Sequence, residues 1–294
     1  MTSKQALYVI IFFSLFIFYS CSNKDMHSLI SGWDDSSEGV FLGKELWGNR
    51  LQDWQAKNGR LECINGQYPL RTVHVLTHEI NNMDASFRID VKVGLIHNQT
   101  IEEEACAGLL IGAGSLDIDY RGRSLIFGRP GENGGLIAGI NGKGELTILD
   151  IGKNLEVIAK SEPVPGLLES LMEGCQLSFS VKPADGNFTG SLTESKTGTS
   201  ITFPVSKERI TGNVGIVAHL GYHTGDGSFW FKDLQLSGPK LSYNPERTLG
   251  PIVSTLHTLS RNILNMSVQL MPVGPNEPDK ILLTYKEQNA ENWE

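Results

Sequence analysis

The segment from Ala105 to Gly152 constrains the fold more than any other part of the chain. It contains four short runs rich in Leu and Ile, separated by clusters of Gly, Asn and Asp. Short apolar or alternating runs with turn residues at close spacing are typical of antiparallel strands. Gly142-Lys143-Gly144, between the runs Leu136–Ile140 and Glu145–Leu149, indicates a tight hairpin turn. No run is long or periodic enough to predict a helix. The segment therefore predicts the middle of a β-sandwich.

Alternating patterns outside this segment support the same fold class. Phe87 to Leu95, FRIDVKVGL, alternates apolar and polar residues, which predicts a half-buried strand of an antiparallel sheet. Asp53 to Glu62 predicts two strands joined by an Asn-Gly turn. In Ser228 to Gly238 the apolar residues do not keep one parity, and a β-bulge near Asp233 would restore the register.

The composition limits the classes of partner. The chain has 294 residues and a net charge of −8, with no basic cluster. Nucleic-acid binding needs a basic face, so no nucleic-acid partner is predicted. Cys63, Cys106 and Cys175 have no spacing typical of a metal site, and their odd number allows at most one disulfide. We interpret all three as small buried residues on strands.

The N-terminus has the pattern of an export signal. Ala6 to Phe18 is an apolar run after Lys4, about as long as the core of a signal peptide and short for a membrane-spanning helix. Phe18-Tyr19-Ser20-Cys21 resembles a bacterial lipobox, although Leu is usual where Phe18 stands and Tyr19 is bulky. The resemblance implies a signal peptide over 1–20, a lipid on Cys21, a polar tether over 21–40, and a place in the outer membrane or periplasm. Simple secretion and an uncleaved anchor are the alternatives.

Three motifs in the middle of the chain together resemble a known family. They are the strand–turn–strand DWQAKNGRLEC, the strand AGLLIG and the closing GIVAHL…GSFWFKDLQLSG. In this order they are similar to the concanavalin A-like jelly-roll family of lectin and laminin-G-type domains, over residues 41–238. The resemblance implies an all-β fold of two stacked antiparallel sheets with an apolar layer between them, and carbohydrate as the ligand.

The character of the chain changes after Gly238. Prolines and the pair Gly250-Pro251 predict a linker over 239–262, with a short helix from Ser254 to Arg261. Alternation in Leu264–Leu270 and again in Ile281–Tyr285 predicts two strands, so 263–294 is interpreted as a partial Ig-like β segment. Two strands alone are marginally stable in water. We therefore expect them to dock on the sandwich or to belong to a larger domain beyond Glu294.

A second resemblance covers this C-terminal region. GPIVSTLHTLSRNILNMSVQLMPVG is similar to the entry of the Ig-like part of PhoD-like alkaline phosphatases, over Gly250 to Tyr285. In that family a metallophosphatase domain follows later in the chain. No catalytic residue is carried over, because the metal-binding motifs of that domain are not in this sequence.

Asp117 and Asp119, in Leu-Asp-Ile-Asp-Tyr, would share one face of a strand. Paired carboxylates hydrolyse glycosides in some jelly-roll enzymes, but those enzymes typically carry a glutamate that this strand lacks. A contact to sugar or to a structural Ca²⁺ is a better functional interpretation. Ordinary exposure to solvent is favoured over both.

Arg123 and Arg129 flank Ser-Leu-Ile-Phe-Gly and would lie on one face of a strand. Recognition of a phosphate or carboxylate needs convergent donors. We favour salt bridges with the nearby aspartates. The Gly-rich stretch that follows precedes a strand rather than a helix, which argues against a nucleotide loop.

His219 and Trp47 complete the candidates for ligand contact. His219 lies in the strand Ala218-His219-Leu220 and would face a binding surface or simply be hydrogen-bonded. Trp47 is a candidate platform for sugar stacking, whereas Trp54 and Trp230 are expected in the core or at a sheet edge.

These patterns favour a non-catalytic carbohydrate-binding module in a lipid-anchored protein of the cell envelope. Its partners would be a carbohydrate and, through the lipid, the membrane, with no cofactor apart from the structural Ca²⁺ considered above. The alternatives are the N-terminal portion of a PhoD-like phosphoesterase and, ranked last, a glycoside hydrolase. No catalytic residue is assigned.

Overall fold

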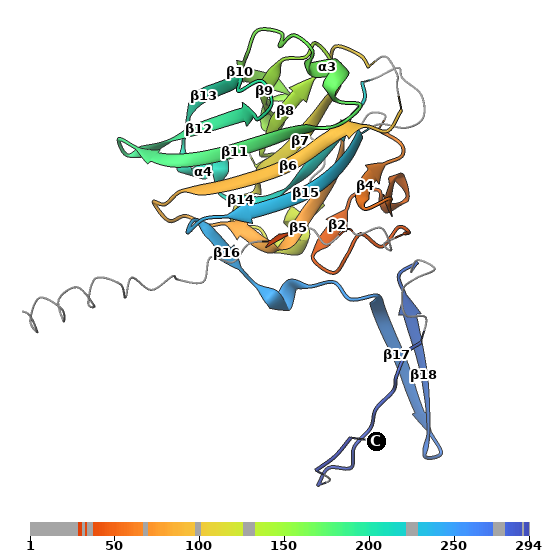
Figure 1. Cartoon of the computed structure of the whole chain (residues 1–294). Coiled ribbons are helices and arrows are strands. Elements are labelled where there is room, and N and C mark those ends of the chain that lie inside the picture. Colours follow the sequence, from red (N-terminus) through yellow and green to blue (C-terminus); the bar gives the residue numbers. More distant parts are fainter. Residues whose placement is uncertain are drawn as a thin grey trace, which may run out of the picture.

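The structure is a computed structural model, and it describes residues 29–30, 33, 38–66, 70–97, 101–125, 133–221, 229–272, 280–289 and 291–293. The described strands form two antiparallel sheets stacked as a sandwich, and a separate two-stranded hairpin below them (Figure 1). The predicted two-sheet antiparallel sandwich is therefore confirmed. The segment 1–20, Cys21 and Arg129 lie outside the described residues.

The first sheet has eight described strands, all antiparallel to their neighbours. Its order is β13 (Ser200–Val205), β12 (Asn187–Glu194), β11 (Cys175–Ala184), β6 (Phe87–Leu95), β15 (Phe229–Ser237), β4 (Arg60–Cys63) and β3 (Trp54–Lys57), and β1 (Leu29–Ile30) also pairs with β15.

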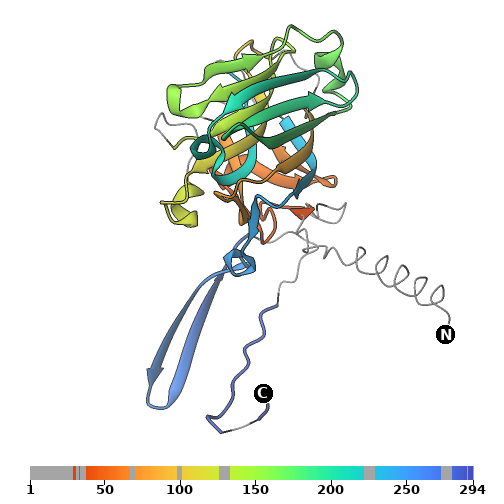
Figure 2. The ribbon, with the colours of Figure 1, turned by 90° about the vertical axis from the view of Figure 1, so that its left-hand side faces the viewer.

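The second sheet also has eight described strands. Its order is β10 (Glu156–Lys160), β9 (Leu146–Asp150), β8 (Leu136–Asn141), β7 (Cys106–Gly114), β14 (Gly212–His219), β5 (Arg71–Ile80) and β16 (Leu241–Tyr243), and β2 (Leu46–Gly48) also pairs with β5. Figure 2 shows the edge of this sandwich, with the hairpin projecting away from it.

Helical segments are short and lie in the connections. They are η1 (Leu51–Asp53), α2 (Tyr120–Arg123), η2 (Ile151–Lys153), α3 (Leu167–Ser170), α4 (Lys207–Ile210) and η3 (Pro245–Arg247). Among the described residues, none of these is long and apolar enough to cross a bilayer.

The main core lies between the sheets. β6 shows how it is built, because Phe87, Ile89, Val91 and Val93 are all buried while Arg88 is exposed. A smaller apolar cluster covers part of the other face of the second sheet. Its members are Leu70, Cys106, Leu110, Ala113, Ile137, Leu149, Ile151 and Val217.

The predicted bulge in β15 is confirmed. The pairing of β15 with β6 shifts between Lys232 and Gln235, and Asp233 has a φ of 55°. Two residues therefore oppose one at this point, so that Phe231, Leu234 and Leu236 all reach the core. The cysteine prediction is also confirmed, since Cys63, Cys106 and Cys175 are free and buried.

Three local predictions were wrong. The expected strand through Asp117 is a turn followed by α2, so the central segment contributes three described strands rather than four. The expected helix over Ser254–Arg261 is instead β17 (Ile252–Ser260), which pairs with β18 (Ile263–Leu270). The segment Ile281–Tyr285 forms no strand. β17 thus lies inside the predicted linker; the other domain boundaries remain predictions.

Candidate functional site

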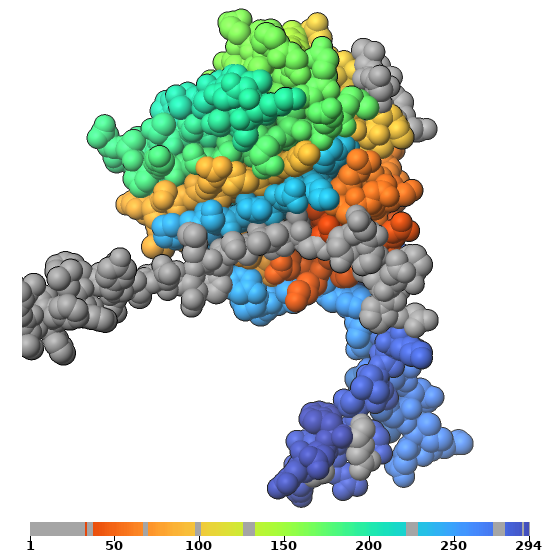
Figure 3. All heavy atoms as spheres, in the orientation of Figure 1, coloured from red at the N-terminus to blue at the C-terminus, as the bar shows by residue number. Residues whose placement is uncertain are grey.

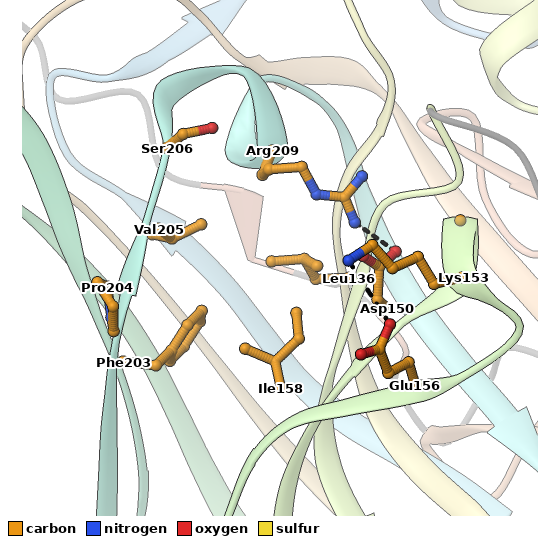
Figure 4. Close-up of a pocket in the computed structure, with 11 residues that line it drawn as sticks. Leu136, Asp150, Lys153, Glu156, Ile158, Phe203, Pro204, Val205, Ser206 and Arg209 are labelled. Carbon is orange, nitrogen blue, oxygen red and sulfur yellow. Dashed lines mark ion pairs between the residues drawn. The ribbon is translucent and has the colours of Figure 1, made fainter.

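Two of the hollows in the described surface have walls rich in apolar side chains. The larger, of about 570 Å³, lies between the edge strands β10 and β13 of the two sheets (Figure 4). Phe203, Val205 and Ile158 line its apolar side, while Arg209 pairs with Asp150 at its rim. A second ion pair there joins Lys153 to Glu156 at 3.6 Å. The charged groups of this hollow therefore neutralise one another, and none of the residues predicted from sequence lines it.

The second hollow, of about 290 Å³, contains one residue predicted from sequence, Trp47. We call it the Trp47 pocket. Its lining residues come from β2, β5, α2, η3 and the residues just after the two helical segments. They are Trp47, Leu76, Tyr120, Arg121, Ser124, Leu125, Arg247, Thr248 and Leu249. Elements far apart in the sequence thus meet at one place on the second sheet.

β2 positions Trp47 by alternation. Leu46 and Gly48 are buried while Trp47 between them is only partly buried, and Trp47 pairs with His74 of β5. Successive side chains of a strand point to opposite faces, so burial of the two neighbours turns the indole toward the pocket. The indole N–H is buried and has no acceptor in the described part of the chain. A donor in this state is available to a ligand oxygen.

α2 positions Tyr120. Asp119 caps this helix, because its carboxylate accepts a hydrogen bond from the backbone N–H of Arg121 at 3.0 Å. The Arg121 side chain returns to the same carboxylate at 2.8 Å, and its guanidinium lies 5.8 Å from the centre of the Tyr120 ring. The Arg121 side chain, then its backbone N–H, hold the pKa of Asp119 below its usual range.

Besides Trp47 and Tyr120, Arg247 forms a wall of the Trp47 pocket. It also links this wall to β5 of the second sheet. Its guanidinium lies 4.9 Å from the centre of the Tyr120 ring and donates to Glu79 Oε2 at 2.7 Å. Arg123 approaches the same oxygen at 2.8 Å. Burial alone would raise the pKa of Glu79, but the hydrogen bonds and charges of Arg247 and Arg123 outweigh it and lower the pKa.

Arg123 is buried because a glycine makes room for it. A side chain at Gly114 would meet the Arg123 stem at 2.2 Å, and Gly114 also has a φ of 86°. The side chain of Arg123 is only 4% exposed. It therefore supports the pocket from beneath, through Glu79, rather than lining it.

The structure brings together three of the predicted residues. Trp47 lines the pocket, Asp119 fixes Arg121, and Arg123 fixes Glu79. Asp117 is exposed in a turn, where its backbone N–H meets the Ser115 hydroxyl at 3.3 Å. The expected shared strand face for the two aspartates is wrong, because Asp119 caps a helix. Arg123 forms a salt bridge, as predicted, but its partner is Glu79 and not one of the nearby aspartates.

His219 lies apart from the Trp47 pocket and does not line it. It is at the end of β14, paired with Cys106, and is fully buried. Burial lowers its pKa to about 4, so the imidazole is neutral at physiological pH. This burial does not fit the expectation that His219 faces a binding surface, and the alternative of a simply hydrogen-bonded histidine stays a prediction.

Sequence reasoning missed Tyr120, Arg121, Leu125 and Arg247. Asp119 followed by a short polar run is a helix N-cap signal that would have identified the α2 side of the pocket. No sequence signal brings Arg247 to Glu79, because that contact depends on the pairing of β16 with β5.

The described residues do not fit the calcium ion considered from the sequence. Ca²⁺ takes six to eight oxygen ligands. Among the described residues, no three His, Cys, Asp or Glu side chains converge in a way that would hold a metal. The Asp119 carboxylate is already held by Arg121. We therefore derive no role for Ca²⁺ at this pocket.

Neither of the two described carboxylates beside the pocket, Asp119 and Glu79, suits the role of a general acid. A general acid needs a carboxyl whose pKa is raised, whereas the pKa values of Asp119 and Glu79 are both lowered. The rings of Trp47 and Tyr120 offer apolar surfaces, and Arg121 offers exposed donors. Such a mixture of aromatic walls with a few polar groups is typical of small-ligand sites.

The described strands form a two-sheet antiparallel jelly-roll sandwich. Solved structures that resemble it include arcelin-5, a lectin-like defence protein from Phaseolus vulgaris, with a TM-score of 0.49 and 12% identity over 72% of this chain and 98% of that chain. The Emp47p carbohydrate recognition domain has a TM-score of 0.49 and 12% identity, covering 74% and 99%. A Bauhinia forficata lectin in complex with GalNAc has a TM-score of 0.48 and 9% identity, covering 73% and 98%. No family model and no curated protein matches the chain.

Proposed function

We propose that the sandwich is a carbohydrate-binding module whose site is the Trp47 pocket. The observation that carries the proposal is the meeting of two aromatic side chains, Trp47 and Tyr120, with Arg121 and Arg247 in one hollow of about 290 Å³. The C–H face of a sugar ring packs on an aromatic ring, while its hydroxyls need donors and acceptors at the rim.

The proposal includes the cellular setting expected from the sequence. Cys21 would carry a lipid, and the tether over 21–40 would hold the sandwich at the outer membrane or in the periplasm. In this setting the module would retain glycans at the cell envelope without cleaving them.

The test is a glycan array on the purified chain, followed by calorimetry on the glycans that bind. Leu125→Asp is the main variant, because Leu125 lines the pocket and its side chain is 58% exposed, so the fold tolerates the change. We expect at least a tenfold loss of affinity, since a charge would occupy the apolar wall. Trp47→Ala should lose binding to a similar degree.

Leu282→Asp is the matched control. Leu282 is 86% exposed and lies in the C-terminal segment, away from the pocket residues. Its affinity for glycan should equal that of the unaltered chain. Absence of binding to every glycan, or equal binding by all variants, would contradict the proposal.

A further inference from the structure

The β17–β18 hairpin has one strongly apolar face. Residues that pair directly across antiparallel strands project on the same side. The pairs Ile252–Leu270, Thr255–Val268, His257–Met266 and Leu259–Leu264 therefore share one face. We call this the hairpin apolar face, and six of its eight residues are apolar.

The opposite face is mainly polar. It carries the pairs Ser254–Gln269, Leu256–Ser267, Thr258–Asn265 and Ser260–Ile263. This difference between the two faces is typical of a sheet that covers an apolar layer with one side and meets water with the other.

No described element covers most of the hairpin apolar face, although Val268 and Leu270 at one end are partly buried. Leu259 is 72% exposed, Leu264 54% and Met266 41%. The hairpin stands away from the sandwich in both ribbon views, and Figure 3 shows it below the body of the molecule. Among the described strands, β17 and β18 pair only with each other, so both outer edges are also open. An apolar surface of this kind indicates an interaction site.

The charges of the hairpin do not oppose a second copy of the chain as the occupant. The whole chain has a net charge of −8, so most of its surface repels an identical molecule. β17 and β18 contain no Asp, Glu, Lys or Arg and no Pro. The charged residues and prolines with which edge strands avoid self-association are thus missing here.

The size of the face agrees with this occupant. β17 has nine residues, and at about 3.4 Å per residue it is roughly 30 Å long, while two strands with their side chains are roughly 10 Å wide. Because the side chains project from the sheet, the accessible area of this face is about twice its flat area. Two packed faces would therefore bury roughly 1,200 Å² of accessible surface in total, which is the lower end for a specific interface.

We infer that two copies of this chain associate by packing their hairpin apolar faces together about a two-fold axis. In such an isologous contact each face serves as the partner of its own copy. The sandwiches do not hinder this contact, because the hairpin projects away from its own sandwich (Figure 2). This inference is independent of the Trp47 pocket.

Light scattering during size-exclusion chromatography tests the inference on the full chain. We expect a dimer at tens of micromolar for the unaltered protein and for Asn265→Lys, whose side chain is on the polar face. Leu264→Lys, at the neighbouring position on the apolar face, should shift the mass to that of a monomer. A monomeric unaltered chain overturns the inference, as does a Leu264→Lys variant that remains dimeric.

A cross-linking experiment covers the case in which Leu264→Lys simply unfolds the hairpin. His257 is at the middle of β17 on the apolar face, so His257→Cys would lie near its copy at the two-fold axis. We expect a disulfide-linked dimer on mild oxidation. Thr258→Cys is the control, because it keeps the same native cysteines and places the new one on the polar face. It should run as a monomer on a denaturing gel. Equal cross-linking of both variants overturns the inference.

Discussion

At the scale of single residues, Glu79 is the group on which the Trp47 pocket depends. One carboxylate accepts from Arg123 beneath the pocket and from Arg247 in its wall, at 2.8 Å and 2.7 Å. Arg123 also has two buried nitrogens, Nε and Nη1, without an acceptor among the described residues. Removing the negative charge would therefore leave a buried guanidinium with no partner.

We predict that Glu79→Gln destabilises the sandwich by about 3 kcal/mol, as expected when one partner of a buried ion pair is lost. Urea unfolding followed by tryptophan fluorescence measures the difference. Asp119→Asn removes a carboxylate from an exposed pair and should leave the unfolding midpoint almost unchanged. Equal midpoints for Glu79→Gln and the unaltered chain would show that Glu79 does not hold the wall.

We expect His219 to make the stability of the fold depend on pH. Burial is the main reason that its pKa falls from 6.5 to about 4, with Glu102 and Glu104 opposing the shift and Arg71 adding to it. Between pH 6.5 and 4 the unfolded chain binds a proton that the folded chain does not. Stability contributed by the neutral imidazole is thus complete above pH 6.5 and is lost as the pH falls toward 4.

We predict that His219→Gln lowers the slope of the unfolding free energy against pH, between pH 4 and 6.5, by up to about 1.4 kcal/mol per pH unit. The measurement is the free energy of unfolding in urea at half-unit steps of pH. His257→Gln is the control, because His257 is exposed and its loss should leave the slope unchanged. Parallel curves for His219→Gln and the unaltered chain would exclude His219 as the source.

At the scale of elements, the β15 bulge explains how an irregular apolar pattern fits a regular sheet. Asp233 is the extra residue, and without it Phe231, Leu234 and Leu236 would alternate with period two. Deleting Asp233 should therefore keep all three side chains in the core. Deleting Gln235 should instead turn Leu236, which is fully buried, toward solvent.

We predict a change within about 1 kcal/mol for the Asp233 deletion, and a loss of about 3 kcal/mol or more for the Gln235 deletion. Thermal unfolding by circular dichroism distinguishes the two variants. A larger loss for the Asp233 deletion would mean that the bulge itself, and not the alternation, stabilises β15.

Period-two patterns predicted the strands of this protein well, and they also caused one error. β6 matches its predicted range, and the bulge was placed correctly. Leu116 and Ile118 alternate with aspartates just as a strand would, but Asp119 gains more as the cap of α2. Alternation alone does not show which of two local arrangements satisfies the backbone.

The β17 error has a different cause. Leu256 and Leu259 are three residues apart, which also fits a helix face. The structure makes a hairpin because Arg261 and Asn262 adopt φ values of 51° and 61°, the left-handed conformation of a two-residue turn. Arg-Asn is a weaker turn signal than Asn-Gly, so the sequence pattern did not reveal this hairpin.

At the scale of the whole molecule, the sandwich and the hairpin differ in how they are stabilised. The sandwich has a buried layer between two sheets, whereas every residue of β17 is exposed. The Trp47 pocket could be predicted only in part from the sequence. Trp47 was identifiable as an aromatic candidate, but the wall at Arg247 depends on the long-range pairing of β16 with β5.

We predict that a chain ending after Gly250 unfolds at the same temperature as the full chain, within about 2 °C, because the removed residues bury little against the sandwich. A chain ending after Tyr243 should unfold at least 4 °C lower, since it also loses the bond from Arg247 to Glu79. Differential scanning calorimetry measures both. A large drop for the first variant would show that the hairpin stabilises the sandwich.

Arg247 lies between the Trp47 pocket and the C-terminal hairpin in the sequence. The segment that closes the Trp47 pocket is also the segment through which everything C-terminal is attached, since β17 begins five residues later. A pulling force on the C-terminal part would reach the Arg247–Glu79 bond before it reached either sheet. Under the proposed function, mechanical load on the C-terminal part and ligand binding would therefore depend on the same short connection.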